Sequence, residues 1–199
     1  MIAYIEGKIS LKTPTYIFLE NGNIGFQIHI SLNTYQEIQH LETCKLFTYM
    51  NIKKDGQNIA GFELYGFKEE SEKVMFELLI SVSGIGANTA RVMLSSMSTQ
   101  VIKNAILLEN ERAISSVKGI GPKTAKRVIL ELKDKVAKAT DSLNMPINSH
   151  NNLREEALIA LTMLGFNKNT AQNALQSIQK GNPNIDSVED MIKQALKIL

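Results

Sequence analysis

The chain has 199 residues, of which 44% are hydrophobic and 21% charged, and its formal net charge is +2. This composition supports folded cores and argues against wholesale disorder, while so small a net charge leaves a nucleic-acid ligand to be decided by local charge. Cys44 is the only cysteine, which excludes an internal disulfide and a thiolate metal cluster. We find no apolar run of membrane-spanning length and no secretory signal, so we expect a cytoplasmic protein without a membrane partner.

Residues 1–66 predict a small β-barrel. Residues 25–30 alternate apolar and polar side chains, as a half-buried strand does, and residues 15–20 are rich in strand-forming types. The Asn-Gly-rich segment between them indicates a hairpin turn. Several short strands in so few residues favour a closed barrel, because closure removes exposed strand edges. The expected strands are residues 15–20, 25–30, 45–52 and 62–65.

The hydrophobic period becomes helical from about residue 69 onward. Ser98 is a predicted N-cap, and Pro122 fits the first turn of a helix that reaches about Lys138. Residues 139–152 are polar and lack either period, which predicts a flexible linker.

The last 47 residues, 153–199, predict a small helical domain. Their apolar spacing indicates short amphipathic helices, and Ser187 with Asp190 resembles a capping pair. So short a segment can barely fold alone, which favours an apolar face that serves a partner. The expected helices are residues 153–164, 170–179 and 187–199.

The helical zone contains an internal repeat with an offset of 35 residues. The sequence VSGIGANTAR at residues 82–91 returns as VKGIGPKTAK at residues 117–126, and the last position is basic in both copies. A single Gly-x-Gly is a weak signal, and alone it would be as consistent with a tight helix–helix turn. Two copies in one helix–loop–helix context are a strong signal for helix-hairpin-helix units.

The spacing of this repeat suits a phosphate. Glycine permits positive φ and close approach of the backbone, and the helix that follows offers unpaired N–H groups and a positive dipole end. The isoleucines should point inward, while threonine hydroxyls and basic side chains surround each loop. Such a site contacts DNA backbone without reading bases. The predicted DNA-binding residues are Ser83, Gly84, Ile85, Gly86, Asn88, Thr89, Arg91, Lys118, Gly119, Ile120, Gly121, Lys123, Thr124, Lys126 and Arg127.

Catalytic chemistry is not indicated. The histidines His29, His40 and His150 lack metal-ligand spacing, and no nucleotide-binding phosphate loop occurs, so we expect no metal, no cofactor and no catalytic residue. A helix-hairpin-helix repair enzyme, such as a glycosylase or nuclease, remains the alternative, although the absence of Trp argues against a base pocket.

A protein that binds single-stranded DNA through its barrel is a further alternative. It would require exposed aromatic side chains gathered on one face of the barrel, where successive bases could stack. The sequence supplies aromatic residues in the β zone but does not tell which face they occupy. The available side chains are Tyr4, Tyr16, Phe18 and Tyr49.

Several segments together resemble the RuvA family of bacterial Holliday-junction proteins. They are MIAYIEG at residues 1–7, LYGF at 64–67, the doubled hairpins, and ALTMLGF at 160–166, in the family's order along essentially the whole chain. The resemblance implies an α+β multidomain fold. Its parts would be an OB-fold barrel (1–66), a tandem helix-hairpin-helix domain (67–138), a flexible linker (139–152) and a UBA-like three-helix domain (153–199).

The resemblance also implies a function without intrinsic enzymatic activity. The family forms homotetramers, alone or paired as octamers, that hold a four-way Holliday junction open during homologous recombination and DNA repair. It recruits the hexameric AAA+ motor RuvB, which hydrolyses ATP, and works with the resolvase RuvC. The positions implied to bind RuvB are Leu161, Leu164, Phe166 and Leu199. At helical spacing the first three are also explicable as residues of the domain's own core.

One position departs from the family's pattern. The family carries two adjacent acidic residues on a β-hairpin at the tetramer centre, which repel phosphates and keep strands apart. The matching positions of this strand-separating pin are Lys54 and Asp55, so only Asp55 keeps the charge, and the hairpin is longer here. Asp55 is also explicable as a turn residue before Gly56.

Overall fold

The protein divides into two compact units, Met1–Thr140 and Asp141–Leu199, and each is described by itself. The predicted α+β multidomain fold is confirmed. The computed structural model describes residues 2–56, 58–144, 149–182, 185 and 187–199.

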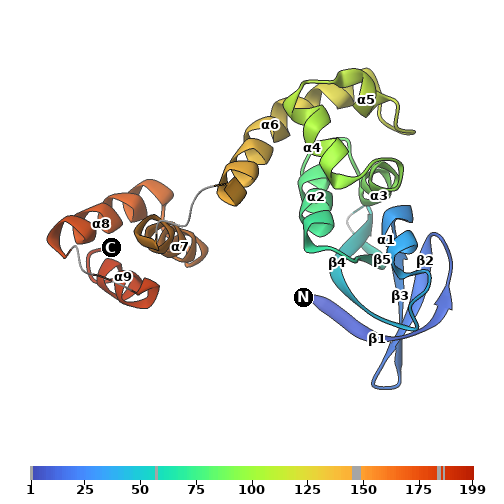
Figure 1. The fold of residues 1–199 in the computed structure, drawn as a ribbon, viewed down its shortest axis with the longest axis horizontal. Helices are drawn as coiled ribbons and strands as arrows, with labels where there is room; N and C mark the ends of the chain where they lie inside the picture. The colour runs from blue at the N-terminus through green and yellow to red at the C-terminus, as the bar shows by residue number, and fades with distance from the viewer. Residues whose placement is uncertain (1, 57, 145–148, 183–184, 186) are drawn as a thin grey trace. The chain divides into compact units, whose positions relative to one another are not determined.

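The first unit begins with the expected closed barrel, in the strand order β1-β2-β3-β5-β4 (Figure 1). Neighbouring strands are antiparallel except for β3 and β5, which are parallel, and this is the arrangement of an OB fold. Ile17, Leu19, Ile28 and Leu46 fill the interior and have no exposed surface. The strands are β1 (Tyr4–Lys12), β2 (Tyr16–Asn21), β3 (Ile24–Ile30), β4 (Thr43–Asp55) and β5 (Asn58–Phe67).

Two local signals explain the barrel's connections. Gly22 and Asn23 both have positive φ, as the two-residue turn between β2 and β3 requires. Helix α1 (Leu32–Ile38), which the sequence pattern does not predict, follows β3 and is capped by Ser31, whose side chain accepts from the Thr34 amide. Its seven residues are too few to establish a helical period.

The helices that follow complete the first unit. Ser98 caps α4 by accepting from the Val101 amide at 3.3 Å, and Pro122 opens α6, both as predicted. The helices are α2 (Glu70–Ile80), α3 (Ala87–Ser96), α4 (Thr99–Leu107), α5 (Glu111–Ser115) and α6 (Pro122–Asn144).

The stretch expected to be a linker, residues 139–152, differs from its prediction at both ends. Helix α6 continues to Asn144, and α7 already begins at Ser149. Extending a formed helix costs far less than nucleating one, and residues 139–144 contain neither Gly nor Pro to end it. Residues 145–148 lie outside the described residues.

An aromatic cluster joins the barrel to the helices. The Phe76 ring of α2 is fully buried, and its centroid lies 5.3, 5.1 and 4.9 Å from those of Tyr49, Tyr65 and Phe67 on β4 and β5. Such ring pairs add about 0.5–1.5 kcal/mol each to their area burial. Because Tyr65 and Phe67 belong to the same core as the helices, the barrel and the first hairpin form one packed body.

A polar cluster lies beside these rings. The buried Glu72 carboxylate of α2 accepts from the Ser31 hydroxyl at 2.5 Å and from the Thr34 hydroxyl at 2.7 Å, so it bridges to the start of α1. Asn33 of the same helix donates through Nδ2 to the Leu94 carbonyl of α3 at 2.6 Å. Burial raises the pKa of Glu72 above its ordinary value, although the two hydroxyls oppose the shift.

The second unit is a small three-helix domain, as predicted. Its core contains Ala157, Leu161, Leu175 and Met191, and Ser187 accepts from the Asp190 amide at 3.2 Å, which confirms the expected cap. The helices are α7 (Ser149–Met163), α8 (Lys168–Gly181) and α9 (Val188–Ala195).

Glu72→Gln should flatten the pH dependence of stability. An acid whose pKa is raised by folding stabilises the protein fully below its unfolded value of 4.5, and that contribution is lost as the pH rises through the folded value. The wild-type free energy of unfolding should therefore fall more than that of the variant between about pH 5 and pH 7 in urea denaturation. Glu70→Gln, at an exposed position of the same helix, is the control. Parallel wild-type and Glu72→Gln profiles would contradict this.

Candidate nucleic-acid interface

The two copies of the sequence repeat fold into two equivalent loops between helices. The first loop joins α2 to α3, and the second joins α5 to α6. The Ile85 amide donates to the Val82 carbonyl at 3.1 Å, and Ile120 repeats this bond to Val117 at 3.0 Å. Both isoleucines are buried, as expected, so each loop is fixed to the core below it.

The first glycine of each loop is required by the backbone. Gly84 has φ +96° and Gly119 has φ +93°, a region that side chains with a Cβ rarely adopt. A Cβ on Gly84 would lie 3.9 Å from the Thr124 hydroxyl, and one on Gly119 would lie 3.8 Å from the Thr89 methyl. Each loop therefore faces the threonine of the other, and the two loops form one reciprocal pair.

The second glycine of each loop has a different role. Gly86 has an ordinary φ of −89°, and a Cβ there or on Gly121 would meet nothing within 4 Å. Gly86 caps α3 without a side-chain hydrogen bond, which leaves the first-turn N–H groups available to an anion. Packing therefore does not require a glycine at either position.

Basic side chains surround the second loop more densely than the first. Lys118 and Lys123 are exposed, and within the described residues neither forms an ion pair. Lys126 lies 4.0 Å from the Glu111 carboxylate. Arg127 donates to the Ser83 carbonyl at 3.1 Å, so this cation bridges the second hairpin to the first loop.

Arg91 lies differently from the other predicted DNA-binding cations. Its guanidinium donates through Nη1 to the Thr15 carbonyl of the barrel at 2.9 Å and through Nη2 to Asn88 Oδ1 at 2.9 Å. Arg91 therefore positions α3 against the barrel, which spacing alone could not indicate because Thr15 is 76 residues away.

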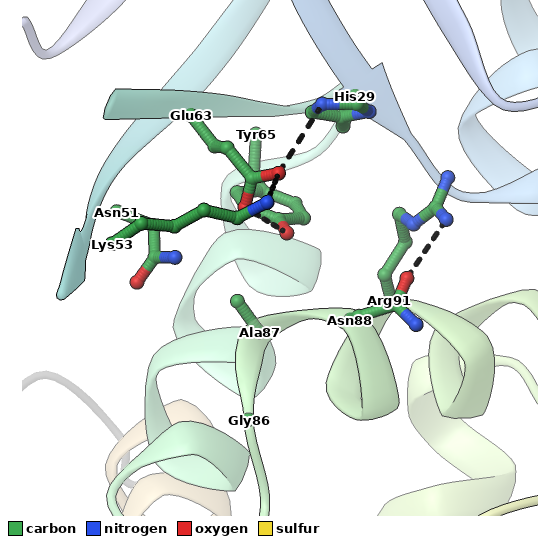
Figure 2. Close-up of a pocket in the computed structure, with 9 residues that line it drawn as sticks. All are labelled: His29, Asn51, Lys53, Glu63, Tyr65, Gly86, Ala87, Asn88 and Arg91. Carbon is green, nitrogen blue, oxygen red and sulfur yellow. Dashed lines mark hydrogen bonds and ion pairs between the residues drawn. The ribbon is translucent and has the colours of Figure 1, made fainter. Parts of the chain in front are cut away.

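Side chains of the barrel also lie near the first loop, and sequence reasoning did not select them. A cleft beside the start of α3 is lined by Asn51, Lys53 and Glu63 of the β4–β5 hairpin and by His29 of β3 (Figure 2). Lys53 pairs with Glu63 at 2.7 Å across the β4–β5 hairpin, and the parallel pairing of β3 with β5 brings His29 beside them. No local motif could have signalled this cluster.

The residues of the predicted pin lie at the end of the long β4–β5 hairpin. In the strand register Lys54 stands opposite Ile59, and Asp55 stands opposite Asn58. The side chains of Lys54 and Asp55 lie outside what the structure describes.

The predicted partner-binding residues of the second unit divide into two groups. Leu161 has no exposed surface and belongs to the core, so it cannot contact a partner in the folded domain, while Phe166 and Leu199 pack at the core's edge. Leu164 is 61% exposed just beyond the end of α7, because that helix stops at Met163. Leu164 alone of these residues offers a large apolar surface.

The features that the two alternative functions would require are only partly present among the described residues. Of the aromatic side chains proposed for a single-strand platform, Tyr16 and Phe18 lie side by side on β2 with ring centroids 5.7 Å apart, whereas Tyr4 lies on β1 and Tyr49 packs on Phe76. Among the described residues, no cluster of three or more His, Cys, Asp or Glu side chains could hold a metal ion. No helix in the same part of the chain has the length and apolarity to cross a membrane.

An OB barrel followed by a reciprocal pair of glycine loops and a three-helix domain defines a multidomain protein of the tandem helix-hairpin-helix class. Comparison with known families agrees throughout. Residues 1–66 match the RuvA N-terminal domain, residues 76–134 the SAM-like helix-hairpin-helix tandem, and residues 152–199 the RuvA C-terminal domain. The chain belongs to the RuvA family.

Relatives similar over their whole length support this assignment. A protein of Cytophaga hutchinsonii is 48% identical, one of Flavobacterium psychrophilum 46% and one of Christiangramia forsetii 44%, each covering 100% of both chains. All three are named Holliday junction branch migration complex subunit RuvA.

Comparing Gly84→Ala with Gly86→Ala should show which of the two glycines is needed for folding and which for access of a ligand. Gly84→Ala forces a Cβ into positive φ and should lower the free energy of unfolding by about 1–3 kcal/mol. Gly86→Ala meets open space and should cost less than about 1 kcal/mol as a poorer N-cap. Urea denaturation measures both. Gly86→Ala should nevertheless weaken binding to DNA in a gel shift, and unchanged affinity in this well-folded variant would mean that the second glycine serves no ligand.

Proposed function

We propose that this protein is the non-catalytic, Holliday-junction-binding subunit of a RuvAB branch migration complex, acting in the cytoplasm in recombination and DNA repair. The observation that carries the proposal is the reciprocal pair of glycine loops, each of which presents helix N-terminal amides beside exposed glycines. Such loops bind phosphate without reading bases. The names of the full-length relatives point to the same role.

A fourfold assembly would suit this geometry. Two phosphate-binding loops in each subunit become two on each arm when four copies surround a four-way junction. Once one phosphate is bound, the others are held at high effective concentration near their loops, so individually weak contacts together give tight binding. We therefore propose a homotetramer as the DNA-binding form, with a paired octamer on DNA and the resolvase RuvC as a further partner.

The remaining parts of the chain would serve the same complex. The barrel of residues 1–66 would direct its β4–β5 hairpin at the crossover, where Asp55 repels phosphate and keeps strands apart. Residues 67–138 would hold the arms. The domain of residues 153–199 would dock the ATPase RuvB, with Leu164 as the proposed contact, because an exposed leucine beside a helix end can bury its surface on a partner.

The proposal predicts a strong preference for branched DNA. A four-way junction should bind more tightly than a duplex or a single strand of equal length, because only the junction engages every loop of the assembly at once. Gel shifts at several salt concentrations measure this. If roughly six phosphates are neutralised, affinity for the junction should fall by about 10³ between 50 and 200 mM salt. Equal affinity for all three ligands would rule out the junction as the preferred ligand.

A second test concerns the motor. Leu164→Glu should leave folding and junction binding unchanged, since the side chain is exposed in the second unit, but should reduce junction-dependent stimulation of ATP hydrolysis by RuvB severalfold. Gln172→Glu adds the same charge at an exposed position of α8 and serves as the control. Full stimulation by Leu164→Glu would place the motor contact elsewhere.

A further inference from the structure

The cleft between the β4–β5 hairpin and the start of α3 has a volume of about 480 Å³ and opens beside the first glycine loop (Figure 2). Its two walls come from different parts of the first unit. Asn51, Lys53 and Glu63 extend from the barrel, while Gly86 and Asn88 belong to the loop and the first turn of α3. The cleft is thus continuous with the proposed phosphate site of the first hairpin.

The α3 wall offers hydrogen-bond donors. Gly86 caps the helix without a side-chain bond, so the first-turn amides face outward unsatisfied by a cap. Asn88 Oδ1 accepts from Arg91 Nη2 at 2.9 Å, as Figure 2 shows. Because its oxygen is occupied by this bond, the Asn88 amide presents its Nδ2 hydrogens to a ligand.

The barrel wall holds a cation that is already paired. Lys53 Nζ lies 2.7 Å from Glu63 Oε1, and the Tyr65 hydroxyl donates to Glu63 Oε2 at 3.1 Å. His29 Nε2 lies 3.9 Å from Glu63, and burial lowers the pKa of His29 below its ordinary value. Lys53 and Glu63 cancel each other, which leaves the Arg91 guanidinium as the uncompensated charge on the lining.

We propose that this cleft is a further backbone-phosphate site, in which Lys53 moves from Glu63 to a phosphate of the DNA strand held by the first hairpin. This rests on the proposed function. The lysine side chain can make the move because its ammonium lies on a flexible four-carbon stem and is more than half exposed. The donors of α3 and Asn88 complete the contacts from the opposite wall.

Glu63 makes this second contact conditional. A phosphate entering the cleft must compete with the carboxylate for Lys53, so an isolated phosphate gains little. A phosphate that is tethered to one already bound at the first loop arrives at high effective concentration and can displace Glu63. Glu63 therefore favours a strand that already lies along the first hairpin over incidental contacts.

The test uses the full-length protein and a four-way junction. The key comparison is Lys53→Ala in the Glu63→Gln background against Glu63→Gln alone, because neither protein leaves an unpaired carboxylate. We expect Glu63→Gln to tighten binding and the added Lys53→Ala to weaken it, each by roughly fivefold to tenfold, the order of one net hydrogen bond at an exposed site. Lys53→Ala should also reduce the slope of log affinity against log salt by about 0.9 for each phosphate that the variant no longer neutralises.

Lys8→Ala is the matched control. Lys8 is an exposed barrel lysine that pairs in register with Thr43, ten residues from Lys53 along β4, or about 33 Å of extended strand. Lys8→Ala should change neither the affinity nor the salt slope. Melting temperatures of all variants verify that the barrel is folded.

The outcomes separate this inference from the proposed function. If Lys53→Ala behaves like Lys8→Ala while Lys123→Ala still weakens junction binding, the cleft is not a phosphate site but the hairpins are. If Lys123→Ala and Gly86→Ala also leave affinity unchanged, the proposed function itself fails. If inorganic phosphate at about 1 mM and constant ionic strength abolishes the effect of Lys53→Ala, the cleft binds an isolated anion, and the proposed requirement for a tethered DNA phosphate is overturned.

Discussion

The packing of Phe76 against Tyr49, Tyr65 and Phe67 is the interaction on which the geometry of the first unit depends. It joins the barrel and the helices in one continuous hydrophobic core. Without it, only the connecting backbone would link the two parts. Glu72 and Arg91 then fix the orientation through hydrogen bonds to α1 and to barrel carbonyls. The first glycine loop is therefore held rigidly against the β4–β5 hairpin.

A rigid platform matters because each of the proposed DNA contacts is individually weak. Backbone amides and lysines at an exposed loop contribute little unless several act on one ligand at fixed spacing. The reciprocal approach of Gly84 to Thr124 and of Gly119 to Thr89 fixes the spacing of the two loops in the same way. Because the loops are held at fixed positions, several weak electrostatic contacts can act together on a DNA ligand whose phosphates have a matching arrangement.

The sequence predicted those features that depend on local signals. The hairpin turn at Gly22, the caps at Ser98 and Ser187, and the repeated loops were accessible because each rests on a few adjacent residues. Features that depend on tertiary contacts could not be predicted from the sequence. The approach of His29 to Glu63 and the bond from Arg91 to the Thr15 carbonyl join elements that lie far apart in the chain, and no spacing along the chain encodes them.

The two hairpins have similar backbone conformations but differ in the number of their basic side chains. The first loop carries Ser83 where the second carries Lys118, and Lys123 replaces Asn88. Long-range attraction accelerates encounter, whereas short contacts in a formed complex slow its dissociation. The second hairpin should thus capture DNA first and the first hairpin should retain it, so the two copies of one motif would control different steps in the lifetime of the complex.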